Sequence, residues 1–176
     1  MIKDLKLEVL EDTMSTGLSP RNGGYMHGAA SVCLDHCKHA LISSFHVRGY
    51  INQEYNLVRC AITDADRKSF GDLEEATEYG AMGVAIAIIH DQTQWQVKRA
   101  WKGTYFDFWV GNSNGAVLFQ EYLKLEISGD LKGTDAEVEA RLKIKTDQIR
   151  RSAQPALLSC VIIVEFGTPK SITHVE

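Results

Sequence analysis

The chain contains no run of about 18 apolar residues, the length a membrane-spanning helix needs, and its first twelve residues, MIKDLKLEVLED, contain no apolar signal core. The first absence argues against a transmembrane protein, and the second argues against a secretory signal. We therefore expect a soluble, cytoplasmic protein with no membrane partner.

Cysteine is scarce, and the four cysteines at positions 33, 37, 60 and 160 have no framework spacing. A disulfide-built fold is therefore not expected, and reduced thiols are the default. Cys33, His36 and Cys37 do share one face of an expected helix. Zinc needs three or four converging ligands, whereas one helix face supplies two at most, so we favour buried thiols and a capping histidine over a zinc site.

An overall excess of positive charge is also missing, because 19 lysines and arginines face 23 aspartates and glutamates, for a net charge of −4. This balance argues against a protein whose whole surface binds nucleic acid. The charge is uneven, however, since residues 93–151 carry ten basic and eight acidic residues while the remainder carries nine and fifteen. A local basic surface is therefore expected in the second half of the chain.

No repeat, low-complexity segment or linker divides the 176 residues, of which 44% are hydrophobic and 24% charged. This composition is typical of one globular domain. Within it we expect a β-α-β-β unit over residues 1–70, a core over residues 72–166 and a peripheral tail over residues 167–176.

A central hairpin is predicted over residues 103–128. Residues 105–110 and 118–128 each alternate between apolar or aromatic residues and others, which is typical of strands, and the glycine- and asparagine-rich residues 111–115 between them predict a turn.

Alternation along these two strands places one carboxylate on each, Asp107 and Glu126, on the same side of the sheet if the polar faces coincide. Tyr105, Trp109 and Tyr122 would flank them. Two neighbouring carboxylates are unfavourable unless they hold a cation, share a proton or meet a basic group. The alternative is a solvated face of the sheet.

The remaining elements follow from periodicity and capping residues. Strands are expected at 3–10, 41–48, 55–63, 94–101 and 156–166, helices at 26–40, from 73 to about 89 and at 135–151, and a long loop at 15–28. The late part of the second helix, VAIAII, could equally be a strand. Gly80 and Gly83 would permit close approach of another backbone.

Residues 72–166 are thus predicted to run helix, strand, strand, strand, helix, strand. This order, with Asp107 on the second strand and Glu126 on the third, resembles the core of the PD-(D/E)XK nuclease-like superfamily, which includes restriction endonucleases and junction resolvases. The resemblance implies an α+β fold with a mixed sheet. It further implies that the two carboxylates bind Mg²⁺ and activate water on a phosphodiester, assisted by Glu75 or Glu78.

The sequence departs from the family motif at two positions. Ser128 stands where the motif has lysine, and Phe106 stands where proline would precede the first acid. Lys124 lies on the same strand face as Glu126, and Lys143 or Lys145 on the following helix could reach inward.

Three hypotheses for function remain open. The first is a metal-dependent nuclease, or an inactive relative that binds nucleic acid, with Asp107, Glu126, Lys124 and Glu78 at the catalytic site and Mg²⁺ as cofactor. The second is a non-enzymatic protein that binds a small molecule or a partner in an acidic, aromatic-lined pocket. The third is a homo-oligomer whose N-terminal unit supplies the interface. The candidate pocket residues are Tyr105, Trp109, Tyr122, Lys143 and Lys145.

Overall fold

The computed structural model describes residues 2–112, 120–152 and 157–176. The strands are β1 Lys3–Lys6, β2 Ile42–Gly49, β3 Gln53–Val58, β4 Gln96–Arg99, β5 Phe108–Asn112, β6 Gln120–Asp130, β7 Leu158–Glu165 and β8 Lys170–Val175. The helices are the 3₁₀ helix η1 Leu7–Glu11 and the α-helices α1 Thr13–Thr16, α2 Pro20–His36, α3 Asp64–Ser69, α4 Leu73–Thr93 and α5 Asp135–Ile149. None of the helices in these ranges is long and apolar enough to cross a membrane.

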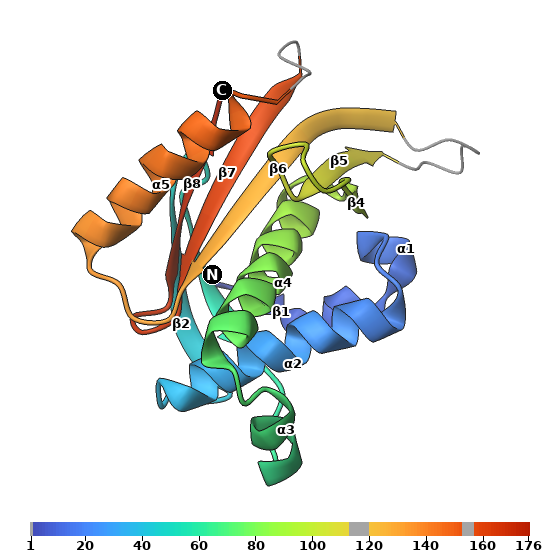
Figure 1. The fold of residues 1–176 in the computed structure, drawn as a ribbon. Coiled ribbons are helices and arrows are strands. Elements are labelled where there is room, and N and C mark those ends of the chain that lie inside the picture. Colours follow the sequence, from blue (N-terminus) through green and yellow to red (C-terminus); the bar gives the residue numbers. More distant parts are fainter. Residues whose placement is uncertain (1, 113–119, 153–156) are drawn as a thin grey trace.

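All of these strands belong to one mixed sheet, in the order β1-β3-β2-β8-β7-β6-β5-β4. β6 runs parallel to β7, whereas β5 runs antiparallel to both β4 and β6. Helix α4 covers β6 and β7 on one face and packs against α2, while α5 covers β6, β7 and β8 on the other face (Figure 1). The predicted α+β class with a mixed sheet is therefore confirmed, and so is the element order from α4 to β7.

Helix α4 is positioned by a cap at its start and by a close crossing with α2. Asp72 accepts hydrogen bonds from the backbone N–H groups of Glu74 and Glu75, which satisfies two donors at the start of the helix. A Cβ atom on Gly80 would lie 2.9 Å from the Cα of Ala30 in α2, so glycine is what allows the two helix backbones to approach. The segment VAIAII continues this helix, and the alternative of a strand is wrong.

The N-terminal region corrects two predictions. The strand expected at 3–10 ends at Lys6, because the next residues wind into η1 and so bury both Leu7 and Leu10. The loop expected at 15–28 is largely helical, since Ser19 caps α2 and Pro20 occupies the first turn, where proline's missing N–H has no helical partner to lose.

The C-terminal residues are not a peripheral tail. They form β8, which lies between β7 and β2 and joins the N-terminal strands to the rest of the sheet. The turn into β8 is held by the carboxylate of Glu165, which is 1% exposed and accepts hydrogen bonds from the backbone N–H groups of Gly133, Gly167 and Thr168. Sequence alternation over this short polar segment was too weak to indicate a central strand.

The central hairpin is present as the antiparallel pair of β5 and β6. The predicted turn at 111–115 lies partly outside the described residues. A register shift between Val110 and Gly111 leaves Tyr122 as an extra residue in β6, which is a β-bulge.

Candidate functional site

The candidate site lies where β6 extends beyond the paired part of β5. β5 begins at Phe108, opposite Leu125, so the remaining residues of β6 border open space on that side. Asp107 directly precedes β5 and makes the last two hydrogen bonds to β6 on this side. Its backbone N–H donates to the Leu125 carbonyl (2.9 Å), and its Oδ2 accepts from the backbone N–H of Ile127 (2.9 Å). The side chain of Asp107 therefore takes the place of a backbone acceptor, which fixes its position.

Glu126 projects from β6 toward α5 and is only 2% exposed. Its Oε1 accepts hydrogen bonds from Nζ of Lys145 (2.7 Å) and from Nε2 of Gln148 (2.9 Å). These two residues are three positions apart, so they share one face of α5. The second acid of the pair is thus held by the helix that covers it.

The two carboxyl groups are neighbours, as alternation along the strands predicts. Burial, the charge of Asp107 and a hydrogen bond between the two carboxyl groups raise the pKa of Glu126 to about 7, although the bond and charge of Lys145 act in the opposite direction. Above that pH Glu126 is ionised beside Asp107, so a cation bound between them would neutralise negative charge.

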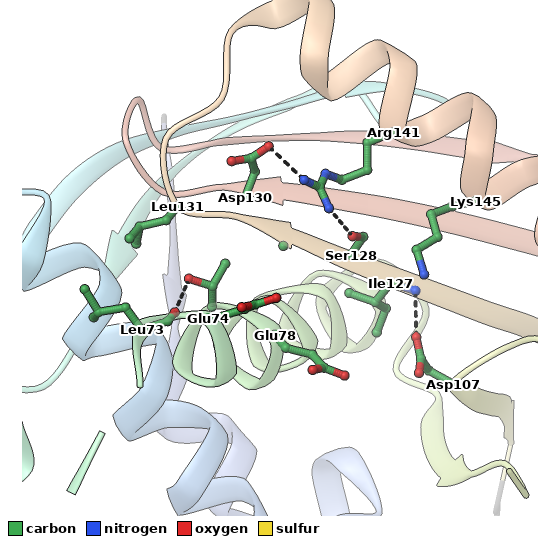
Figure 2. Close-up of a pocket in the computed structure, with 12 residues that line it drawn as sticks. Leu73, Glu74, Glu78, Asp107, Ile127, Ser128, Asp130, Leu131, Arg141 and Lys145 are labelled. Atoms are coloured by element: carbon green, nitrogen blue, oxygen red, sulfur yellow. Dashed lines mark hydrogen bonds and ion pairs between the residues drawn. The ribbon is translucent and has the colours of Figure 1, made fainter. Parts of the chain in front are cut away.

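Two hollows lie beside this pair, and Asp107 and Lys145 line both of them. The first, here called the acidic hollow, has a volume of about 460 Å³. Figure 2 shows α4 supplying the carboxylates of Glu74 and Glu78 from one side, while α5 supplies Arg141 and Lys145 from the other. Its lining is Leu73, Glu74, Thr77, Glu78, Asp107, Ile127, Ser128, Gly129, Asp130, Leu131, Arg141 and Lys145.

The second, here called the aromatic hollow, has a volume of about 490 Å³ and also reaches Asp107 and Lys145. It is bounded by the loop between β4 and β5 and by the face of α5 that holds Glu126. Its lining is Arg99, Ala100, Trp101, Lys102, Gly103, Tyr105, Phe106, Asp107, Glu126, Lys145 and Gln148.

Five predicted site residues line these hollows. Asp107 and Lys145 line both, Glu78 lines the acidic hollow, and Glu126 and Tyr105 line the aromatic hollow. Of the two candidate helix glutamates, Glu78 lines the acidic hollow, whereas Glu75 lies beside Tyr25 and raises the pKa of that phenol, after the larger effect of burial. The four-residue spacing of Glu74 and Glu78 places both on the same side of α4.

The predicted lysines other than Lys145 lie elsewhere. Lys124 is buried on the α5 side of β6, but its Nζ donates to Oγ of Ser152 (2.8 Å) beyond the end of α5, and burial lowers its pKa. Lys143 is exposed on α5 and lines neither hollow, because a residue two positions from Lys145 points about 200° around the helix.

Two of the predicted pocket aromatics are also displaced. Trp109 is buried in a small core beneath α5, with its ring edge-on to that of Phe106 and the ring centroids 4.5 Å apart. Tyr122 is the residue at the bulge, and it stacks on Trp95 with the ring centroids 5.0 Å apart. Neither ring lines the acidic hollow or the aromatic hollow, because core packing directs Trp109 and the bulge directs Tyr122 away from them.

Gln148 and Arg99 are site residues that sequence reasoning missed. Arg99 places its NH1 3.4 Å from Oδ1 of Asp107, and its guanidinium lies over the ring of Phe108 at 4.7 Å from the centroid. Gln148 could have been found, since it lies one turn from Lys145 on the same helix face. Arg99 carried no comparable signal, because its contact depends on the conformation of the loop that follows β4.

The described residues contain no group of three or more histidines, cysteines, aspartates or glutamates placed to hold a metal ion. Cys33, His36 and Cys37 do not converge: Cys33 is buried beside Thr77, with its pKa raised to about 12 by burial, Cys37 donates to the Leu131 carbonyl (3.5 Å) and His36 is exposed. Mg²⁺, in contrast, is usually held by one or two carboxylates, with water and substrate oxygens completing its shell. The pair of Asp107 and Glu126 fits that requirement.

The acidic pair makes the pH dependence of stability a test of this geometry. Glu126 has an ordinary pKa of 4.5 and a pKa of about 7 in the folded protein, so the folded state binds more protons between these values, and its stability falls as pH rises through that window. Glu126→Gln keeps the acceptor for Lys145 and places an amide N–H₂ toward Asp107. As pH rises from 5 to 8, we expect the free energy of unfolding of this variant to increase relative to that of the wild type by on the order of 2–3 kcal/mol. Urea unfolding at each pH measures the difference.

Glu139→Gln is the matched control, because Glu139 is an exposed residue of the same helix that pairs only at the surface with Arg48. Its stability relative to the wild type should change little over that pH range. Equal pH profiles for wild type and Glu126→Gln would contradict the raised pKa of Glu126.

No family model matches the sequence, and no curated protein or solved structure matches it significantly. The chemistry of the two hollows and of the carboxyl pair beside them is therefore what indicates a function.

Proposed function

We propose that this chain is a Mg²⁺-dependent phosphodiester hydrolase that acts on nucleic acid. The observation that carries the proposal is the convergence of Asp107, Glu126 and Lys145, which come from the loop just before β5, from β6 and from α5. The element order over residues 73–165 and the placement of the two acids also agree with the resemblance to the PD-(D/E)XK nuclease-like superfamily.

Asp107 and Glu126 are the residues that would hold the cation. Oδ1 of Asp107 lies 3.4 Å from NH1 of Arg99, and Lys145 and Gln148 both donate to Oε1 of Glu126. The hydrogen bond between the two carboxyl groups would be given up when a cation binds between them. When bound, Mg²⁺ supplies neutralisation of phosphate charge and a more acidic bound water. Because the pKa of Glu126 is about 7, its proton is readily displaced at neutral pH.

Lys145 takes the place of the lysine that the motif lacks at Ser128. Its Nζ bonds both Oε1 of Glu126 (2.7 Å) and Oε1 of Gln148 (3.2 Å), and its side chain is partly exposed to both hollows. An ammonium held there can donate to a phosphate oxygen or to the attacking water, which favours an active enzyme over an inactive relative. The positive charge is supplied from the helix instead of from the strand.

The test of this assignment compares two lysines on one helix. Lys145→Met removes the ammonium that faces the acid pair, and we expect cleavage of single-stranded DNA, RNA or plasmid in Mg²⁺ or Mn²⁺ to fall by about 10²-fold or more. Lys143→Met, two positions away and outside both hollows, should retain the wild-type rate.

Cleavage must also stop in EDTA, because the proposed reaction requires the cation. A purified wild-type protein that cleaves none of these substrates with either metal would contradict the proposal. Equal rates for the two lysine variants would remove Lys145 from the catalytic site.

A further inference from the structure

We infer that the aromatic hollow binds single-stranded nucleic acid, with unpaired bases stacked on Trp101 and Tyr105 beside the acid pair. Single-stranded nucleic acid would be the substrate class of the site described above. Cleavage of the bound strand rests on the proposed function, whereas binding does not. Three features of the loop between β4 and β5 support it: the hydrogen bonds that fix its conformation, its exposed aromatic side chains and its basic side chains.

This loop holds a defined conformation. Thr104 donates from its backbone N–H (3.3 Å) and from its Oγ1 (2.8 Å) to the carbonyl of Trp101, which closes a turn. Gly103 and Tyr105 have φ angles of 95° and 67°, both in the left-handed region that non-glycine residues rarely adopt. Phe106 then inserts beneath α5, and Nε2 of Gln148 donates to the Tyr105 carbonyl (3.4 Å). The loop therefore contacts α5 through Phe106 and Gln148, and it contacts the sheet through the hydrogen bond from Asp107 to Leu125.

The same loop presents two large aromatic side chains to solvent at the rim of the site. Trp101 is 82% exposed and Tyr105 is 48% exposed, and both line the aromatic hollow. Leaving apolar ring faces in water is unfavourable, so large exposed aromatics close together at a concave site are typical of a surface that contacts a ligand. Flat rings that bound a hollow are suited to stacking against other flat rings.

The charges of the two hollows differ in a way that indicates where phosphates enter. The aromatic hollow contains three basic side chains, Arg99, Lys102 and Lys145, against the two acids of the pair. In the acidic hollow the carboxylates of Glu74, Glu78, Asp107 and Asp130 outnumber the cations of Arg141 and Lys145. A polyanion is attracted to the first and repelled by the second, unless a cation is bound there.

Basic side chains bind the phosphates of any nucleic acid, whereas stacking side chains add affinity for single strands. In a duplex the base faces are covered by neighbouring bases, whereas in a single strand each base exposes a π-face that tryptophan or tyrosine can contact. Lys102 and Arg99 would then contact the phosphates of the stacked nucleotides. Single-stranded DNA and RNA share this chemistry.

Binding of labelled oligonucleotides tests the inference without requiring cleavage. Wild-type protein in EDTA is titrated against oligo-dT, oligo-U and a DNA duplex of equal length, with fluorescence anisotropy as the readout. We expect one of the single strands at least to bind more tightly than the duplex. Trp101→Ala and Tyr105→Ala should each weaken that binding by about fivefold or more. Tyr50→Ala is the matched control. Tyr50 is 73% exposed in the turn between β2 and β3, and it lines neither hollow.

Lys102→Ala should reduce the slope of log affinity against log salt by about 0.7, the value for one phosphate contact on a single strand. Because Trp101 and Tyr105 are exposed, their variants should unfold at the wild-type temperature, so a binding loss is not a folding loss. Tighter binding to the duplex, or unchanged affinity in both aromatic variants, would overturn the inference.

The outcomes separate this inference from the proposed hydrolysis. Mg²⁺-dependent cleavage that is lost in Asp107→Asn but unaffected by Trp101→Ala and Tyr105→Ala overturns the stacking inference and leaves the hydrolase proposal standing. Single-strand binding that depends on Trp101, without cleavage in Mg²⁺ or Mn²⁺, supports the inference and contradicts the hydrolase proposal.

Discussion

Asp107→Asn is expected to lower the rate of Mg²⁺-dependent phosphodiester cleavage by at least about 10³-fold, since charge stabilisation by a bound cation contributes several kcal/mol to the transition state. Asparagine keeps an oxygen that can accept from the backbone N–H of Ile127, so the hairpin stays closed while the negative charge is removed. Single-turnover cleavage of a labelled oligonucleotide in Mg²⁺ measures the loss.

The control for this substitution is Asp147→Asn on the exposed face of α5, where the carboxylate pairs with Arg150 three residues later. That variant should cleave at the wild-type rate. If Asp107→Asn retained activity, either the cation would be held elsewhere or the cleavage would come from a contaminant, and the assignment of the acid pair would fail.

The largest loss of stability is expected from Glu165→Ala. The substitution removes a buried carboxylate and leaves the backbone N–H groups of Gly133, Gly167 and Thr168 without this acceptor. Hydrogen bonds to charged groups contribute about 1.5–3 kcal/mol each, so we expect a loss of about 3 kcal/mol or more in the free energy of unfolding. Urea titration followed by circular dichroism measures it.

Glu139→Ala provides the comparison, because it removes an exposed carboxylate of α5 and should change stability by less than about 1 kcal/mol. Glu165→Gln retains one acceptor oxygen, so its free energy of unfolding should lie between those of Glu165→Ala and Glu139→Ala. A Glu165→Ala protein as stable as the wild type would mean that the turn into β8 does not depend on this side chain.

The acid pair and Glu165 illustrate opposite uses of a buried carboxylate. Glu165 receives several backbone N–H groups, so its burial is compensated and it organises a turn. Glu126 lies beside a second acid, and its pKa rises to about 7 because burial and Asp107 are only partly offset by Lys145. An arrangement that destabilises the folded protein at neutral pH is typical of a functional site, where stability is lower so that a ligand can be bound.

Lys145 reaches the acid pair from a helix and not from the strand that carries Glu126. In β6 the residue two positions after Glu126 is Ser128, whose Oγ accepts from NH1 of Arg141 (3.3 Å). Lys145 reaches Glu126 from α5 and brings an ammonium to the same carboxyl group. A cationic group near the acid pair is thus available in space although the linear pattern lacks it.

Much of the fold could be predicted from the sequence because it depends on local physical chemistry. Alternation of apolar residues identified β5 and β6, and capping residues located the starts of α4 and α5, where Asp72 and Thr134 accept from the backbone as expected. The same alternation placed Asp107 and Glu126 on one side of the sheet. These features depend on residues close together in the chain.

Only the tertiary structure decided which distant side chains meet the acid pair. It selected Lys145 over Lys124 and Lys143, and Glu78 over Glu75, because the rotation of each helix about its axis is set by packing against the sheet. It directed Trp109 into the core and Tyr122 toward Trp95, and it inserted β8 between β7 and β2. Strand order, bulges and helix orientation depend on contacts between residues far apart in the chain, and no local sequence pattern encodes these contacts.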